Sequence, residues 1–278
     1  MNVIRAEALG LCFGVRDALA IAANVERPED TTINGDLVHN EAVLVQLDAR
    51  GFRRAAEQNR SLLPDTSRVL VTAHGISDAE RRRLESAGKV LIDTTCPLVR
   101  RAHRAAQALA AEGYHVLVIG RPGHVEVRGI VEDLAGYDVI ASADDVRRYA
   151  SEKLGVICQT TTPPRAVEPI LSAIREQNPG AEVRIVDTIC QPTRDRQQAV
   201  EKLLAKVDAL VVVGGSRSNN TRELVALCRE HGVPAYHVQS AADLVADWFE
   251  NCASVGLTAG TSTLDDTIED VHAALLRL

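Results

Sequence analysis

The sequence predicts an α/β protein made of three similar units with mostly parallel sheets. Short runs of Val, Ile and Leu alternate with amphipathic helical stretches along all 278 residues, a pattern typical of parallel α/β folds. A second observation is an internal repeat, in which a strand, a cysteine and a helix recur in the same order. Repetition of this kind indicates one supersecondary unit used several times.

The elements expected with most support are short apolar strands and longer amphipathic helices. No Gly/Ser-rich or Pro-rich linker and no low-complexity segment interrupts them. Apolar runs bounded by turn residues predict strands, and apolar residues at helical spacing predict helices. The strands are expected at 115–120, 153–159, 209–215 and 254–260, and the helices at 97–112, 192–206, 219–231 and 264–277.

The repeat is clearest around three cysteines. DTTCPLVRRAHRAA begins at Asp93 and DTICQPTRDRQQAV begins at Asp187, so both show Asp-Thr-X-Cys followed by a helix. ALGLCFGVRDALAIA, which begins at Ala8, has the same order of strand, cysteine and helix. The similarity predicts three units, at residues 9–95, 96–189 and 190–278.

The N-terminal strand is expected to complete the third unit. The first two units each end with a strand that runs into the next cysteine, in VLIDTTC and VRIVDTIC. The third unit ends with helix 264–277 and has no such strand of its own. The stretch NVIRAEA leads into Cys12, so we expect residues 2–8 to pair into the third sheet.

Composition and charge exclude several classes of protein. The formal net charge is -7, and no block of Lys or Arg suggests binding to nucleic acid or to a membrane surface. No apolar run reaches the roughly 18 residues of a transmembrane helix. Charged residues interrupt the N-terminal apolar stretches, so a signal peptide is not expected. We therefore expect a cytoplasmic protein.

Three of the six cysteines are candidate metal ligands. Cys12, Cys96 and Cys190 each stand at the start of a predicted helix, where a thiol pKa is lowered and the metal-binding thiolate is favoured. Three thiolates on a cubane cluster leave one iron open to substrate. A zinc site of three cysteines is the alternative. The remaining cysteines are interpreted as structural: Cys158, Cys228 and Cys252.

Polar loops follow the predicted strands at the carboxyl ends where parallel sheets bind ligands. His39, His74 and His124 each follow a strand end, and further polar residues lie in two other loops: Ser218, Asn220 and Ser262. Such a donor-rich, largely uncharged set suits a diphosphate held by hydrogen bonds and helix N-termini. A zinc site of three histidines is the alternative, although it leaves the cysteines unexplained.

Glu126 is the candidate proton donor, because it is the only carboxylate within the proposed ligand loops. A neighbouring diphosphate should raise its pKa by like-charge repulsion and keep it protonated. Thr160 is a hydroxyl that could orient Glu126 or relay its proton, and His124 is the next candidate acid. The competing interpretations are a glutamate that begins a helix and a threonine that caps one.

Nine motifs in this order resemble the 4-hydroxy-3-methylbut-2-enyl diphosphate reductase family of the non-mevalonate isoprenoid pathway. The resemblance extends over essentially the whole chain. The motifs are GLCFGV (10–15), VHN (38–40), AHG (73–75), DTTCPLV (93–99), GHVEV (123–127), QTT (159–161), TICQPTRDRQ (188–197), SNNTREL (218–224) and TAGTST (258–263).

The resemblance implies a trefoil of three α/β units around a central iron–sulfur cluster. It implies that Cys12, Cys96 and Cys190 bind one [4Fe–4S] cluster with one iron not bound by cysteine. It also implies that Glu126 donates a proton with the support of Thr160. The positions that match substrate binding are His39, His74, His124, Thr160, Ser218, Asn219, Asn220 and Ser262.

The implied reaction is a reductive dehydration that uses two electrons and two protons and yields isopentenyl and dimethylallyl diphosphate. The family's electrons usually come from ferredoxin or flavodoxin. Two other functions stay open on the residues themselves. One is a non-catalytic iron–sulfur sensor with the same fold, and the other is a hydrolase of phosphate esters that uses the three histidines, with or without a metal.

Overall fold

The strands of the protein form three parallel sheets. The computed structural model describes residues 1–60 and 62–278. In these residues there are three four-stranded sheets, and every strand pairing in them is parallel. The predicted α/β class with parallel sheets is confirmed.

The first sheet has the strand order β3-β2-β4-β5. Its strands are β2 (Thr31–Asn34), β3 (Arg53–Ala55), β4 (Arg68–Val71) and β5 (Val90–Asp93). The helices of this part of the chain are α1 (Phe13–Ala23), α2 (Glu41–Ala49) and α3 (Asp78–Ser86).

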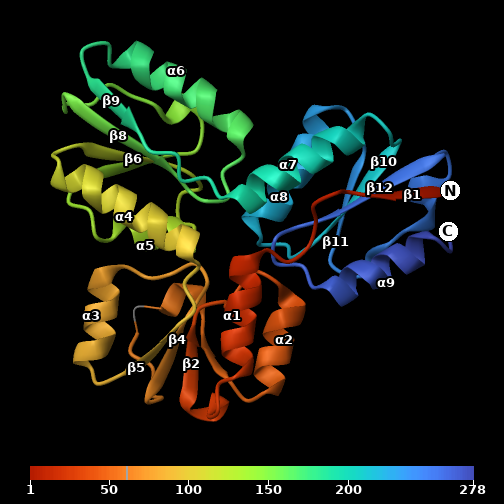
Figure 1. Ribbon diagram of the computed structural model, residues 1–278, viewed down its shortest axis with the longest axis horizontal. Coiled ribbons are helices and arrows are strands. Elements are labelled where there is room, and N and C mark those ends of the chain that lie inside the picture. Colours follow the sequence, from red (N-terminus) through yellow and green to blue (C-terminus); the bar gives the residue numbers. More distant parts are fainter. Residues whose placement is uncertain (61) are drawn as a thin grey trace. The chain divides into compact units, whose positions relative to one another are not determined.

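The second sheet has the order β7-β6-β8-β9. Its strands are β6 (His115–Ile119), β7 (Tyr137–Ile140), β8 (Lys153–Cys158) and β9 (Glu182–Ile185). Figure 1 shows its helices on both faces, with α6 on one side and α4 and α5 on the other. These helices are α4 (Pro97–Ala111), α5 (Val125–Val131) and α6 (Val167–Gln177).

The third sheet has the order β1-β12-β10-β11. Its strands are β1 (Asn2–Arg5), β10 (Ala209–Val213), β11 (Ala235–Val238) and β12 (Ser254–Ala259). Figure 1 shows α9 on one face of this sheet and α7 and α8 on the other. These helices are α7 (Gln191–Leu204), α8 (Asn219–Glu230) and α9 (Asp265–Leu275).

The three sheets repeat one topology. In the first two, the order runs second, first, third and fourth strand of the unit. In the third, β11, β10 and β12 occupy the same places and β1 takes that of the fourth strand. The N-terminal strand pairs in parallel with β12, with Asn2 opposite Ser254. This is the pairing that the missing closing strand of the third unit predicts.

The two central strands of each sheet are mostly buried, whereas edge strands such as β3 and β9 are largely exposed. All five residues of β10 are buried, as expected for a central parallel strand covered on both faces. Val116 and Val118 of β6 pack towards α4 and α5, whereas Leu117 and Ile119 pack towards α6. The alternation along β6 therefore supplies two cores, one on each face of the sheet.

The chain divides into two compact units. One contains 1–15, 39–43 and 191–278, and so holds the third sheet. The other contains 16–38 and 44–190, and so holds the first and second sheets. We call these the C-terminal unit and the N-terminal unit. Along the described part of the chain, every helix is too short or too polar to cross a lipid bilayer.

Candidate functional site

Each of the three candidate cysteines lies where a sheet strand gives way to a helix. Cys96 is the N-cap of α4, and Cys12 and Cys190 directly precede α1 and α7. All three are half-buried. All three thiols therefore share one setting, near the positive end of a helix dipole.

The backbone holds the three cysteines in equivalent places. The amide of Cys96 donates to the carbonyl of Ala73 over 3.1 Å, and that of Cys190 donates to Thr160 over 2.9 Å. The amide of Cys12 donates to Thr261 over 3.0 Å. In each sheet the acceptor belongs to the loop after the neighbouring strand, so the cysteine lies beside that polar loop.

The Asp-Thr-X-Cys motif has a structural explanation. The hydroxyl of Thr94 donates to the carbonyl of Val71, the last residue of β4, over 2.6 Å. Asp93 accepts from the amide of Thr95 over 2.9 Å. The hydroxyl of Thr188 likewise donates to the carbonyl of Cys158 at the end of β8. In both copies of the motif, the threonine hydroxyl therefore hydrogen-bonds the cysteine loop to the adjacent strand.

The first copy reaches the same geometry with glycine. Gly10 stands two residues before Cys12 and has a φ of 74°, in the left-handed region that favours glycine. Its amide donates to the carbonyl of Ala259, the last residue of β12, over 3.3 Å. A β-carbon at Gly10 would lie 2.7 Å from Ile268 Cδ1. A threonine in place of Gly10 would therefore require Ile268 to shift and a strained backbone.

The chemistry of the cysteines fits an iron–sulfur cluster. All six cysteines of the chain are thiols rather than disulfides, and the three candidates share one backbone setting. Cys12 belongs to the C-terminal unit, whereas Cys96 and Cys190 belong to the N-terminal unit. Among the residues that the structure describes, no three His, Cys, Asp or Glu side chains form a group that could hold a metal ion.

The other three cysteines lie in surroundings typical of residues that pack in the interior. Cys158 is buried in β8, and Cys228 is buried in α8, where its thiol donates to the carbonyl of Leu224 over 3.1 Å. Cys252 is half-buried, and burial raises the pKa of its thiol. A thiol with a raised pKa is a poor metal ligand at neutral pH.

The polar residues of the C-terminal unit gather around the start of α8. We call His39, Ser218, Asn219, Asn220 and Ser262 the Asn220 group. The hydroxyl of Ser262 donates to the carbonyl of His39 over 3.2 Å. Ser218 is the N-cap of α8 and accepts from the amide of Thr221 over 3.3 Å. Asn219 is half-buried in the first turn of the same helix.

Asn220 has a side-chain donor that none of the described residues uses. The residue is buried, and its Oδ1 accepts from the amide of Thr261 over 3.1 Å. The buried Nδ2 has no hydrogen-bond partner among the described residues. Because buried donors are almost always paired, this Nδ2 is suited to a ligand acceptor.

Asn40 supports this group, although the sequence did not single it out. Its Nδ2 donates to the carbonyl of Ser262 over 2.6 Å, and its Oδ1 accepts from the amides of Ala42 and Val43. An Asn immediately before a helix is a common N-cap. That signal was present in Val-His-Asn, but the partner Ser262 is 222 residues away in the sequence.

The second group lies in the N-terminal unit. We call His74, His124, Glu126 and Thr160 the Glu126 group. The rings of His74 and His124 meet edge to face, with centroids 5.7 Å apart. His124 is the N-cap of α5, and its Nδ1 accepts from the amide of Glu126 over 3.1 Å. With Nδ1 as acceptor, neutral His124 carries its proton on Nε2 and can donate it to a ligand.

Glu126 is a buried carboxyl with a raised pKa. Its side chain is 2% exposed, and Oε1 accepts from the amide of Thr160 over 2.7 Å. Burial raises its pKa to about 7, although hydrogen bonds from the amide and hydroxyl of Thr160 act to lower the pKa. The expected elevation therefore arises from burial alone, before any diphosphate is bound.

The two groups account for every site residue that the sequence predicted outside the cysteines. Thr160 links the Glu126 group to Cys190, since its carbonyl accepts from the Cys190 amide. Ser262 follows Thr261, which accepts from the Cys12 amide. The Glu126 group is therefore hydrogen-bonded directly to Cys190. The Asn220 group is adjacent in sequence to the residue that is hydrogen-bonded to Cys12.

Comparison with known proteins gives matches along the whole chain. The family model described as LytB protein matches residues 3–276. A relative from Anaeromyxobacter sp. (strain K) is 35% identical over 282 residues, which cover 100% of both chains. One from Methylibium petroleiphilum is 36% identical over 283 residues, which cover 100% of this chain and 85% of the relative. Both relatives are named 4-hydroxy-3-methylbut-2-enyl diphosphate reductase.

Solved structures give the same result for the fold. The E-1-hydroxy-2-methyl-but-2-enyl-4-diphosphate reductase from Plasmodium falciparum matches with a TM-score of 0.90 and 28% identity, over 100% of this chain and 88% of that one. A second structure, described as the terminal enzyme of the non-mevalonate pathway, has a TM-score of 0.66 and 29% identity over 100% of both chains. The fold predicted from the sequence is therefore the fold of these reductases.

Proposed function

Because this chain belongs to the LytB family of 4-hydroxy-3-methylbut-2-enyl diphosphate reductases, we propose that it makes isopentenyl and dimethylallyl diphosphate. The substrate would be (E)-4-hydroxy-3-methylbut-2-enyl diphosphate. The allylic C–O bond breaks, two electrons and two protons are taken up, and the hydroxyl leaves as water. The observation that carries this proposal is the buried Glu126 carboxyl, whose pKa of about 7 suits an acid at neutral pH.

Cys12, Cys96 and Cys190 are proposed to hold one [4Fe–4S] cluster. Bound there, the cluster would supply the electrons and an open iron for the substrate hydroxyl. Their equivalent positions at helix starts and their shared backbone hydrogen bonds support this assignment. Reduction needs an external electron donor, and we propose ferredoxin or flavodoxin for this role.

The Asn220 group and the Glu126 group are proposed to bind the diphosphate. The donors are the Asn220 Nδ2 amide, the Ser218 hydroxyl and the imidazoles of the three histidines, together with the Ser262 hydroxyl once it rotates away from the His39 carbonyl. Asn219 and Thr160 are the remaining substrate-binding residues of the proposal. Hydrogen bonds to a charged group contribute roughly 1.5–3 kcal/mol each. A set of neutral donors can therefore hold a diphosphate in a chain with a formal net charge of -7.

Glu126 is proposed to donate the proton that converts the leaving hydroxyl to water. Hydroxide is a poor leaving group, so the C–O bond breaks readily only when a proton arrives. The neutral form of Glu126 is well populated near pH 7 because of its burial. Thr160, which hydrogen-bonds to the carboxyl through its amide and hydroxyl, orients the acid. A buried neutral carboxyl of this kind has no use in a sensor that only stores electrons.

The cluster is tested by anaerobic purification with assay of iron, sulfide and turnover of 4-hydroxy-3-methylbut-2-enyl diphosphate with a reduced dye. The parent should be brown and active. Cys96→Ser should lose most of the cluster, whereas the matched control Cys252→Ser should keep it. A colourless zinc protein, or a full cluster in Cys96→Ser, would contradict the assignment.

The acid is tested separately with Glu126→Gln. This variant keeps the shape and the hydrogen bond from Thr160 but has no proton to donate. It should retain the cluster and the affinity for substrate, while single-turnover rates of the pre-reduced enzyme fall by roughly 10²–10⁴-fold. Near-parental rates would remove Glu126 from the mechanism and make His124 the next candidate.

A further inference from the structure

His103 lies inside the N-terminal unit, where none of the site assignments uses it. It belongs to α4, the helix that begins at the Cys96 cap. Its ring packs against two glycines from different segments. A β-carbon added at Gly129 would lie 3.2 Å from His103 Cε1, and one at Gly75 would lie 3.6 Å from Nε2. The imidazole therefore lies close to both glycines, and Thr95 and Val99 lie close to Gly75 as well.

The two glycines adjoin the Glu126 group. Gly75 follows His74 directly and has a φ of 74°, which favours glycine. Gly129 lies on α5, one turn after Glu126, and the same helix begins at the His124 cap. The His103 ring therefore lies between the loop that carries His74 and the helix that carries Glu126.

The His74 loop is also held from a second direction. Arg60 is buried, and its Nη2 donates to the carbonyl of Gly75 over 3.3 Å. Arg60 can therefore restrain one peptide group of this loop, and among the described residues it has no hydrogen bond to α5. The loop also approaches α5 directly, because a β-carbon at Gly129 would lie 3.6 Å from the backbone carbon of Ile76. The His103 ring lies beside this approach, near both Gly75 and Gly129.

The His103 ring contributes to this packing through its shape rather than through a charge or a hydrogen bond of Nε2. His103 Nε2 is buried and has no hydrogen-bond partner among the residues that the structure describes. Burial lowers the pKa of His103, Asp133 and Asp78 oppose this effect, and Arg100 adds to it. The neutral ring is therefore favoured at neutral pH, and a flat neutral ring can approach two glycine backbones closely.

We propose that His103 is a positioning residue for the diphosphate and acid site, because its ring packs beside both the His74 loop and α5 and so fixes how His74 lies against His124. This inference rests on the proposed function, since it assigns His103 to the site described there. His103 touches neither substrate nor cluster in this proposal. It acts through His74 and through the helix that begins at His124.

The test is a double-mutant cycle on the affinity for inorganic pyrophosphate, measured by calorimetry on the anaerobically purified full chain. His103→Ala should raise the dissociation constant about tenfold or more, as loss of one hydrogen bond to a charged group would. In a His74→Ala background the same substitution should change the constant less than about twofold. Additive effects in a folded protein would overturn the proposal.

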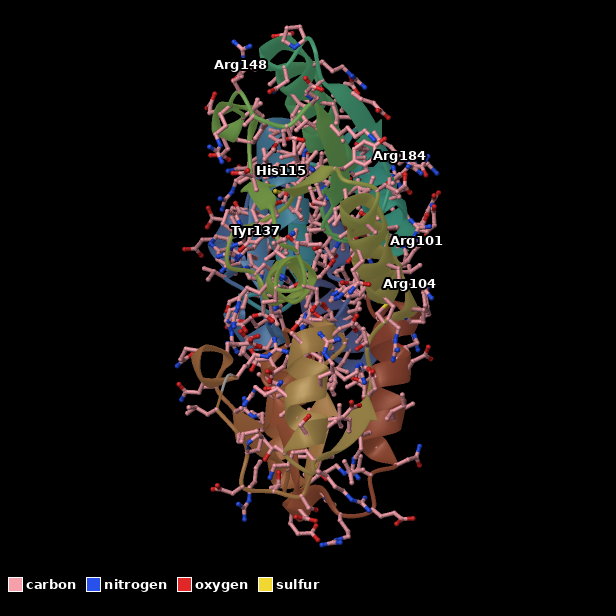
Figure 2. All side chains as sticks on the ribbon, turned by 90° about the vertical axis from the view of Figure 1, so that its left-hand side faces the viewer. Arg101, Arg104, His115, Tyr137, Arg148 and Arg184 are labelled. Atoms are coloured by element: carbon pink, nitrogen blue, oxygen red, sulfur yellow. The ribbon has the colours of Figure 1, made fainter. Side chains whose placement is uncertain are left out.

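Two controls separate positioning from loss of stability. Leu109→Ala removes a buried side chain from the same helix, and it should lower the unfolding midpoint without weakening pyrophosphate binding. Arg104 follows His103 but lies on the exposed side of α4, where Figure 2 labels it. Arg104→Ala should change neither quantity. An affinity loss in Leu109→Ala equal to that of His103→Ala would also overturn the proposal.

A flat replacement tests the role of the ring. His103→Phe keeps a planar ring and should bind pyrophosphate more tightly than His103→Ala, close to the parent. If the folded Phe variant binds as weakly as the Ala variant, ring shape is not what positions the site. A parent that binds no pyrophosphate and turns over no substrate would instead defeat the proposed function. An active parent with an additive cycle defeats only the role of His103.

Discussion

Replacing Glu126 with Gln should make the protein more stable at alkaline pH. Burial raises the pKa of this carboxyl from 4.5 to about 7, so the folded state binds its proton more tightly than the unfolded state does. For such a group the stabilising contribution is fully present below pH 4.5. It is lost as the pH rises to about 7, because the buried carboxyl must then ionise.

The size of the effect follows from the shift. Each pKa unit corresponds to about 1.4 kcal/mol, so a shift from 4.5 to about 7 lowers the stability of the parent by about 3 kcal/mol across this range. The glutamine side chain of the Glu126→Gln variant cannot ionise, and its amide oxygen can still accept from the Thr160 amide. The free energy of unfolding of this variant minus that of the parent should therefore grow by about 3 kcal/mol between pH 4.5 and pH 8.

Urea unfolding of both proteins at several pH values, with equal cluster content, measures this difference. Asp145→Asn is a useful control, because the pKa of Asp145 is lowered by hydrogen bonds from the amides of Ser142 and Ala141. Because the stability that Asp145 contributes is lost only as the pH falls below its ordinary pKa of 3.8, the difference between Asp145→Asn and the parent should stay constant from pH 4.5 to pH 8. A constant difference between Glu126→Gln and the parent from pH 4.5 to pH 8 would refute the reasoning that burial holds the proton on Glu126.

Three further predictions concern other parts of the site. Burial alone would raise the pKa of Asp93, but hydrogen bonds from Thr95 and Arg81 lower it. Asp93→Asn should therefore cost about 1 kcal/mol of stability at neutral pH. Urea unfolding should show that this cost becomes smaller in acid. Gly215→Ala should cost about 2 kcal/mol, because the new β-carbon would lie 2.3 Å from the carbonyl oxygen of His39; an unchanged unfolding midpoint would contradict this. Asn220→Ala should weaken pyrophosphate binding about tenfold in calorimetry, and parental affinity would place the diphosphate elsewhere.

The repeat around the cysteines was predictable because its signals are local. Asp-Thr-X-Cys ends a strand and begins a helix within a few residues, and α4 and α7 begin at or within one residue of the predicted positions. The same kind of reasoning identified the missing fourth strand of the third unit, which β1 supplies by pairing with β12. The boundaries proposed for the three units, 9–95, 96–189 and 190–278, stay predictions.

The raised pKa of Glu126 has a different cause from the one that the sequence indicates. Glu126 was identified as an acid, and its pKa was expected to rise through repulsion by a diphosphate. In the structure the pKa is raised by burial, which no motif reports because it depends on the residues packed around α5. Asn40 stands in the Val-His-Asn motif, yet its hydrogen bond to Ser262 joins two segments that only folding brings together.

The sequence by itself determined the α/β class, the threefold repeat and the identity of the candidate ligands, because strand runs, helix starts and cysteine spacing are properties of neighbouring residues. Only the tertiary structure decided how each cysteine amide meets the loop of the adjacent strand, as Cys96 does with Ala73. It alone placed His103 between Gly75 and Gly129. The physical reason is that such contacts join residues far apart in the chain, and their geometry is set by close packing of whole elements.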